Sequence, residues 1–198
     1  MKKFKKLTGF FPKNNMMGNR KTQIIDLALK LIREKGYVAI SYDDLSKILG
    51  VTKASIHYHF EKKEDLGVAV TERVLQNLQD FSSFITNSNL TVEEKIKNFY
   101  ERQIVLCDGG ICAVSSLQSD YESLPEKVRQ KVREISQLEI TIIKNILKVT
   151  LENRGAKEIE SLAFAIVSCM KGAIQYERVL GKQILPQAMN EISRLLKG

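Results

Sequence analysis

The sequence has no tryptophan, and its 198 residues include only 3 prolines, 11 glycines and 3 cysteines. So few turn-forming residues exclude a sandwich of many short strands, whose turns depend on glycine and proline. No apolar run reaches the ~18–20 residues of a membrane-spanning helix, so we expect no membrane partner. Apolar residues make up 43% of the chain, too many for a protein that is disordered throughout. We therefore expect a globular protein.

The cysteines, Cys107, Cys112 and Cys169, are odd in number, and no signal peptide precedes them. This usage predicts a cytoplasmic protein with reduced thiols. Metal-ligand spacing is missing and both histidines lie elsewhere, so no metal or other cofactor is expected. The sequence also lacks paired carboxylates, a nucleophile with its base, a phosphate-binding loop and a dinucleotide fingerprint, so it does not predict an enzyme.

Positive charge is concentrated at the N-terminus of the chain. The net charge is +8, and residues 1–66 hold 14 basic and 7 acidic residues, against 17 and 16 in residues 67–198. This asymmetry predicts an N-terminal region that binds a polyanion, although a basic tail without a specific partner is the alternative. Residues 1–19 carry five lysines and no acid, so we expect a flexible basic arm, with Met16 and Met17 as alternative start positions.

Beyond the arm, apolar residues recur at intervals of three and four, the period of an amphipathic helix. The expected helices span about residues 20–35, 42–49, 53–59, 63–85, 92–107, 112–122, 125–154, 157–180 and 186–196. Ser41 and Thr52 are expected caps, and residues 91–94 have the pattern of a capping box. Because no strand-like alternation of useful length is present, the predicted fold class is all-α with about nine helices.

Residues 41–60 have the pattern of a helix–turn–helix, with two short amphipathic segments joined at Gly50. The second segment places hydrogen-bonding side chains on outward positions: Lys53, Ser55, Tyr58 and His59. Such side chains suit base edges and phosphates in a major groove. His57 and His59 diverge on a helix, so this pair does not predict a metal site.

With the preceding helix, this stretch resembles the tetracycline-repressor (TetR) family of transcriptional regulators, from Thr22 to about Val70. The matching residues are Ala28, Leu31, Glu34–Tyr37, Leu45, Gly50–Lys53, Tyr58–Phe60 and Lys63–Leu66. The resemblance implies a DNA-binding domain over residues 20–66 and an effector-binding and dimerisation domain over residues 67–198. It also implies a homodimer that binds a near-palindromic double-stranded operator, usually as a repressor, and is released by a small-molecule effector of unknown identity.

The resemblance assigns DNA contacts residue by residue. They are Ser41, Tyr42, Thr52, Lys53, Ala54, Ser55, His57, Tyr58, His59 and Lys63. Lys63 matches a lysine that typically binds phosphate. At position 57 the family usually has tyrosine, and the histidine here has a shorter reach.

The family's effector pocket lies between its middle helices. The matching candidates are Phe99, Tyr100, Gln103, Cys112, Leu117, Tyr121, Phe164, Met170 and Gln175. We expect the dimer surface on the last two helices, whose small residues permit close approach in a four-helix contact. Its expected members are Ile166, Met170, Ala173, Ile174 and Leu195.

Two other functions stay open at this point. Residues 107–113 resemble a TetR subset with a glycine–cysteine segment at the start of helix six, some members of which sense electrophiles or oxidants. Cys112 or Cys107 would then be the sensing thiol, while burial as a small apolar side chain is the alternative. The second alternative is an all-helical small-molecule-binding protein without a DNA function.

Overall fold

The computed structural model describes residues 19–107, 111–149, 151 and 154–197. Within these residues the chain forms nine α-helices, one short 3-10 helix and no strand, which confirms the all-α prediction. The basic arm expected over residues 1–19 lies outside them except for Asn19. The elements are α1 (Arg20–Ala39), α2 (Tyr42–Leu49), α3 (Lys53–His59), α4 (Lys63–Thr86), α5 (Val92–Cys107), α6 (Ala113–Ser119), η2 (Tyr121–Ser123), α7 (Glu126–Lys148), α8 (Ala156–Leu180) and α9 (Leu185–Lys197).

The caps read from the sequence determine where the short helices begin and end. The Ser41 hydroxyl accepts from the backbone N–H of Asp44, and the Asp44 carboxylate accepts from the backbone N–H of Ser41. Gly50 ends α2 with a φ of 64°, in the left-handed region that glycine adopts without strain. Thr52 caps α3 by accepting from the backbone N–H of Ser55. These contacts confirm the expected caps.

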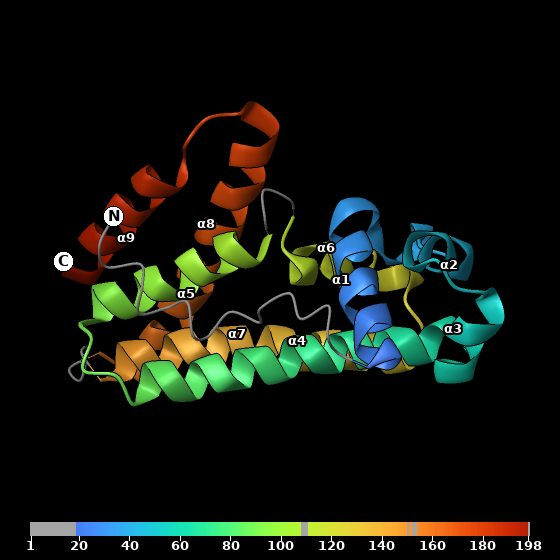
Figure 1. Cartoon of the computed structure of the whole chain (residues 1–198). Helices are drawn as coiled ribbons and strands as arrows, with labels where there is room; N and C mark the ends of the chain where they lie inside the picture. Colours follow the sequence, from blue (N-terminus) through green and yellow to red (C-terminus); the bar gives the residue numbers. More distant parts are fainter. Residues whose placement is uncertain (1–18, 108–110, 150, 152–153, 198) are drawn as a thin grey trace.

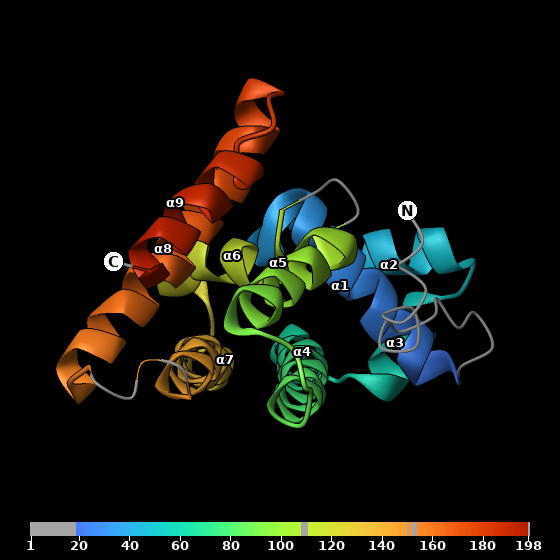
Figure 2. The same cartoon turned by 90° about the vertical axis from the view of Figure 1, so that its left-hand side faces the viewer.

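The two long helices α4 and α7 lie side by side and form the base of the molecule (Figures 1 and 2). The α4 helix has 24 residues, which is ~36 Å at 1.5 Å per residue. The α7 helix ends at Lys148, so the expected continuation to Arg154 is wrong. The side chain of the next residue, Val149, is 71% exposed.

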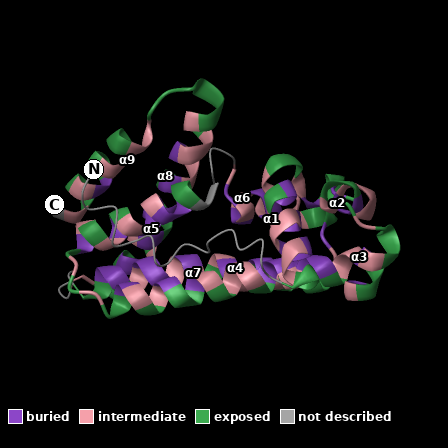
Figure 3. Cartoon of the chain, in the orientation of Figure 1, coloured by how far each residue is buried: buried purple, intermediate pink, exposed green. Residues whose placement is uncertain are grey.

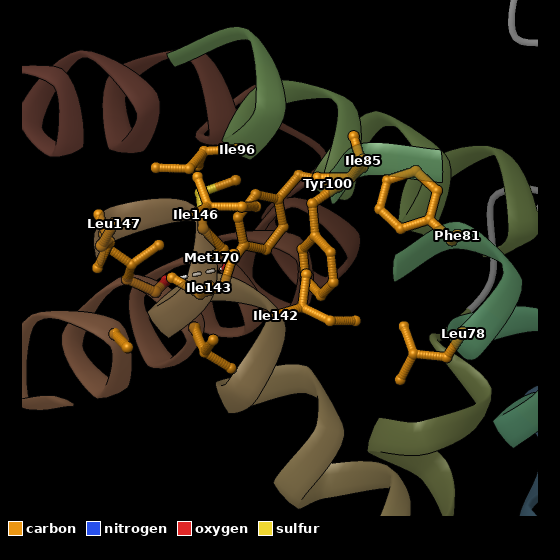
Figure 4. Close-up of a cluster of buried hydrophobic side chains, with 14 of the residues drawn as sticks. Leu78, Phe81, Ile85, Ile96, Tyr100, Ile142, Ile143, Ile146, Leu147 and Met170 are labelled. Carbon is orange, nitrogen blue, oxygen red and sulfur yellow. Dashed lines mark hydrogen bonds between the residues drawn. The ribbon is translucent and has the colours of Figure 1, made fainter. Parts of the chain in front are cut away.

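We call α1–α3 with the first turn of α4 the head, and the rest of the described chain the body. Figure 1 shows α2 and α3 at one end of the molecule and α9 toward the other. The body has its own hydrophobic cluster, built by α4, α5, α7 and α8 around Phe81, Tyr100, Ile143 and Met170 (Figure 4). The buried sides of α4 and α7 can be followed in Figure 3.

The hydrophobic cluster of the head is not confined to the head. It joins Ile24, Leu45 and Ile56 to residues of the body. The body residues in it are Val70, Leu117, Leu124, Val128 and Val132. The expected domain boundary at residue 66 therefore falls within α4 and within one continuous core.

None of the described helices is both long enough and apolar enough to cross a lipid bilayer.

Candidate nucleic-acid interface and regulatory interior

The α3 helix divides its side chains between the core of the head and solvent. Ile56 and the following Phe60 are buried, whereas the side chain of Tyr58 is 85% exposed. Thr52, Lys53, Ala54 and His57 are also exposed, and Ser55 and His59 are half-buried. The predicted contact residues of α3 are thus brought together on one accessible helix that the core holds in place. An exposed tyrosine with a neighbouring histidine ring, 5.1 Å away between centroids, suits contact with a polar surface such as DNA.

Tyr42 connects α2 to the end of α3. Its hydroxyl donates to the backbone carbonyl of Phe60 at 2.9 Å, and its ring meets the His57 ring edge-on at 4.7 Å between centroids. Burial is the main cause that raises the pKa of Tyr42 to about 12, and the charge of Asp65 adds to it. Tyr42 therefore positions α3 as well as lying at the predicted interface.

Lys63, the predicted phosphate contact, is anchored inside the head. Its Nζ donates to the backbone carbonyl of Val38 at 2.9 Å and lies 4.8 Å from the centroid of the Tyr37 ring. Burial lowers the pKa of Lys63 below its usual value. The Tyr37 hydroxyl in turn donates to the backbone carbonyl of Lys63 at 3.1 Å. These contacts join the end of α1 to the start of α4, and the phosphate contact stays a prediction.

The head contains an ion bridge that sequence reasoning missed. Asp43 lies 2.6 Å from Lys47 and 2.9 Å from Lys53, measured from carboxylate oxygen to Nζ. The spacing of four residues between Asp43 and Lys47 is a readable helical signal. The contact with Lys53 crosses the turn between α2 and α3, so it depends on their relative orientation and has no local sequence signal.

The body binds the end of α1 through α6 and the residue that follows it. Asp120, just after α6, accepts from the backbone N–H groups of Tyr37 at 2.7 Å and Val38 at 3.4 Å. The buried Ser116 hydroxyl donates to the backbone carbonyl of Ile32 at 2.7 Å. At Gly36 the backbone takes a φ of 83°, which breaks the helical conformation where the sequence places the end of the helix. The end of α1 is thus a junction between head and body.

Five of the predicted effector residues surround one small void in the body. They are Phe99, Tyr100, Gln103, Cys112 and Gln175, together with residues of α6 and α8. The void measures about 10 Å³, which is at the limit for a single water molecule. This void is therefore too small for an effector, and a ligand enters it only if side chains move.

Polar groups beside this void form a buried network. Glu139, 1% exposed, pairs with Lys171 at 2.8 Å and accepts from Gln103 Nε2 at 3.3 Å. The Cys112 thiol donates to Gln103 Oε1 at 3.1 Å. Burial raises the pKa of Glu139, although the charge of Lys171 opposes the shift. Cys112 is buried, unlike the partly exposed position typical of reactive thiols, and the side chain of Cys107 lies outside the described part of the chain.

The other expected effector residues lie elsewhere. Tyr121 and Phe164 line an open groove of about 910 Å³ over α4, α7 and α8. Leu117 belongs to the cluster of the head, and Met170 is packed in the core of the body. The resemblance therefore assigned to one pocket residues that lie around a void, in a groove and in two separate cores.

The residues expected at the dimer surface need correction. Ile166, Met170 and Ala173 are buried within the chain itself, and Ile174 is half-buried. Of the expected set only Leu195 is exposed. The large apolar side chains that α8 leaves exposed are Phe164, Tyr176, Val179 and Leu180. The sequence indicated small and apolar residues on α8, but it did not indicate which side of the helix the body covers.

No group of three or more histidine, cysteine, aspartate or glutamate side chains in the described ranges is arranged to hold a metal ion.

The sequence of the head matches one family of known proteins. The family model of bacterial regulatory proteins of the tetR family matches residues 24–70. A crystal structure of a TetR transcriptional regulator from Legionella pneumophila is 30% identical, with a TM-score of 0.85, and the match covers 90% of this chain and 97% of that one. The chain belongs to the TetR family.

Two more distant relatives extend this comparison. The negative transcriptional regulator IcaR of the icaADBC biofilm operon in Staphylococcus epidermidis is 28% identical over 116 residues. That match covers 59% of this chain and 63% of the regulator, less than two thirds of its length. The transcriptional regulator FadR from Bacillus subtilis, solved with stearoyl-CoA, is 21% identical with a TM-score of 0.69 and shares the fold over 89% of this chain and 97% of its own.

Proposed function

We propose that this TetR-family chain is a homodimeric transcriptional repressor that binds a near-palindromic operator through α3 and is released by a small molecule held in the body. The observation that carries the proposal is the accessible face of α3, where Tyr58 projects from a helix capped and packed by its neighbours. Because IcaR is named a negative regulator, we propose that this chain also represses transcription rather than activates it.

DNA binding is tested with duplexes selected from a random library. Tyr58→Ala removes an exposed side chain that contributes little to the core, so operator affinity should fall more than affinity for random DNA. Tyr58→Phe keeps the ring and separates the role of the hydroxyl. Lys63→Ala should weaken binding to all sequences and reduce the salt slope by about one contact.

The exposed Lys127 at the start of α7 provides the control for Lys63, because its replacement by alanine removes the same charge from the body. If Tyr58→Ala leaves operator and random DNA binding unchanged, α3 is not the reading helix. If Lys127→Ala reproduces the effect of Lys63→Ala, the loss reflects net charge rather than a phosphate contact.

We propose that the homodimer forms through the exposed apolar side chains of α8 and α9. Val179 is 78% exposed, and Tyr176 and Leu195 add apolar area on the same two helices. An obligate interface buries more than ~2,000 Å², which such helix pairs supply in a four-helix contact. Val179→Glu should yield a monomer in analytical ultracentrifugation at micromolar concentration. Val149→Glu, at the similarly exposed end of α7, is the control, and monomeric unmodified protein would contradict the assembly.

We propose that the effector binds in the body by opening the void beside Gln103 and Cys112. The FadR complex with stearoyl-CoA makes this acyl-CoA a reasonable first probe. A true effector should raise the melting temperature, since it binds the folded state, and release operator DNA at matching concentrations. A ligand that stabilises the protein but leaves DNA binding intact would count against this part of the proposal.

A further inference from the structure

Asp43 is an acidic residue in the region proposed to approach the phosphates of DNA. It is the second residue of α2, and its two carboxylate oxygens are held by different lysines. Oδ2 lies 2.6 Å from Lys47 Nζ, and Oδ1 lies 2.9 Å from Lys53 Nζ. The hydrogen bonds from Lys47 and then Lys53 lower the pKa of Asp43.

The adjacent acid, Asp44, has a structural role that Asp43 does not share. Asp44 completes the capping box with Ser41 and pairs with Lys35 at 2.9 Å. For the Asp43 side chain, by contrast, the described residues provide two direct partners, and both are lysines. Its carboxylate therefore pairs with two cations and takes no part in the cap of α2.

Lys53 is the first residue of α3, the helix proposed to read the operator. A lysine on a flexible stem binds phosphate as a point charge, wherever a phosphate is within reach. On random DNA, a lysine that stays paired brings the Asp43 carboxylate toward a polyanion, and a lysine that leaves Asp43 exposes the unpaired carboxylate to it, so either contact is weakened. A guanine edge at the operator offers the O6 and N7 acceptors to a lysine that stays near its present position.

We propose that Asp43 is a positioning residue for sequence discrimination: it holds Lys53 for a base edge of the operator and keeps Lys53 and Lys47 from the phosphates of random DNA. This inference rests on the proposed function, because it requires α3 to be the reading helix. It assigns to an acid within a basic head the role of weakening binding to wrong sequences.

The test compares Asp43→Asn with Glu93→Gln in the full chain. Glu93 is also the second residue of a helix with a capping box, formed in α5 by Thr91 and Glu94. Both substitutions raise the net charge of the chain by one unit, and both remove an acid from the second position of a helix. Glu93, however, lies in the body. Affinities are measured for a duplex selected from a random library and for a random-sequence duplex, between 50 and 200 mM salt.

We expect Asp43→Asn to bind random DNA about tenfold more tightly than the unmodified protein at 50 mM salt. Each released lysine adds about 0.9 to the slope of log affinity against log salt, so two lysines steepen it by about 2 per head. Affinity for the selected duplex should change less, so the specificity ratio falls. Glu93→Gln should leave the ratio and the slope near those of the unmodified protein.

A second substitution shows whether Asp43 acts through Lys53. In the Lys53→Met background, Asp43→Asn should lose about half of its effect on the salt slope, because one of the two released cations is missing. Circular dichroism melting of all variants identifies any loss of folded protein.

Several results would overturn the inference. Equal gains for selected and random DNA would mean a simple charge effect, as would the same changes in Glu93→Gln. Equal losses on both duplexes would make Asp43 a structural residue of α2. If the unmodified protein binds neither duplex, the proposed function fails with it, whereas discrimination that survives Asp43→Asn refutes only the role of Asp43.

Discussion

Gly67→Ala should destabilise the protein, although alanine is the better helix former. Gly67 lies in α4 where the end of α1 and the start of α7 meet it. A Cβ atom added there would lie 2.8 Å from Tyr37 Cε2 and 2.9 Å from Val128 Cγ2, both closer than real Cβ contacts. The Tyr37 ring cannot move aside freely, because it is buried and its hydroxyl is bonded to the backbone of Lys63.

The magnitude follows from two opposing effects. Overpacking a well-packed core costs about 1–3 kcal/mol, and two rigid close contacts favour the upper half of that range. Replacing glycine by alanine inside a helix contributes about 1 kcal/mol in the opposite direction. The net loss should be about 1–2 kcal/mol, which for a chain of this size lowers the melting temperature by about 3–6 °C.

The assay is a double-mutant cycle that combines Gly67→Ala with Val128→Ala, and the stability of each variant is measured by thermal or urea unfolding. Val128→Ala alone should cost about 2 kcal/mol through lost burial and a residual cavity. In the double variant the new methyl group fills part of that cavity. The stability lost by the double variant should therefore be about 1 kcal/mol less than the sum of the losses in the two single variants. A higher melting temperature for Gly67→Ala, or strictly additive losses, would refute the steric reasoning.

Three further predictions concern other parts of the chain. Glu139→Gln should reduce the pH dependence of the free energy of unfolding. Burial raises the pKa of Glu139 above 4.5 in the folded state, so the contribution of this group to stability falls as pH rises through the raised pKa. The free energies of unfolding in urea at pH 5 and pH 8 should therefore differ less in the variant than in the unmodified protein. Asp120→Ala should cost about 1–2 kcal/mol and speed hydrogen exchange at the amide of Tyr37, whereas unchanged exchange would show that the bond does not hold the junction. Deleting residues 1–15, with five lysines and no acid, should lower affinity for operator and random DNA by similar factors and flatten the salt slope; a loss confined to the operator would mean that this segment reads sequence.

Local signals explain how much of the fold the sequence predicted. The caps at Ser41, Thr52 and Thr91 and the left-handed glycine at Gly50 each act within four residues, and the structure confirms all four. Apolar spacing likewise gave the order of the helices and most of their bounds, but the single helix expected over residues 112–122 is divided into α6 and η2. Such signals depend on the backbone of one helix end, so no knowledge of the tertiary structure is needed to read them.

Features that depend on the orientation of helices were not predictable in the same way. The packing of α8 against α7 and its other neighbours buries Ile166 and leaves Val179 exposed, and the sequence of α8 alone does not specify this orientation. The Asp43–Lys53 pair needs α2 and α3 at their actual angle. The end of α7 was placed too late because the sequence offers a glycine only at residue 155, whereas the helix ends at Lys148.

The small void in the body and the core shared by head and body together constrain how an effector would act. Since the void beside Gln103 measures only about 10 Å³, a ligand that enters it must displace side chains of its lining, which come from α5, α8 and the start of α6. The α6 helix cannot move alone, because Ser116 and Asp120 bind the backbone of α1 and Leu117 lies in the core of the head. A ligand shifts such an equilibrium only by the difference in its affinity for the two arrangements. An effector that opens the void by displacing α6 therefore has to move the head or break these contacts, and hydrogen exchange at the amides of Tyr37 and Val38, which Asp120 binds, would distinguish the two.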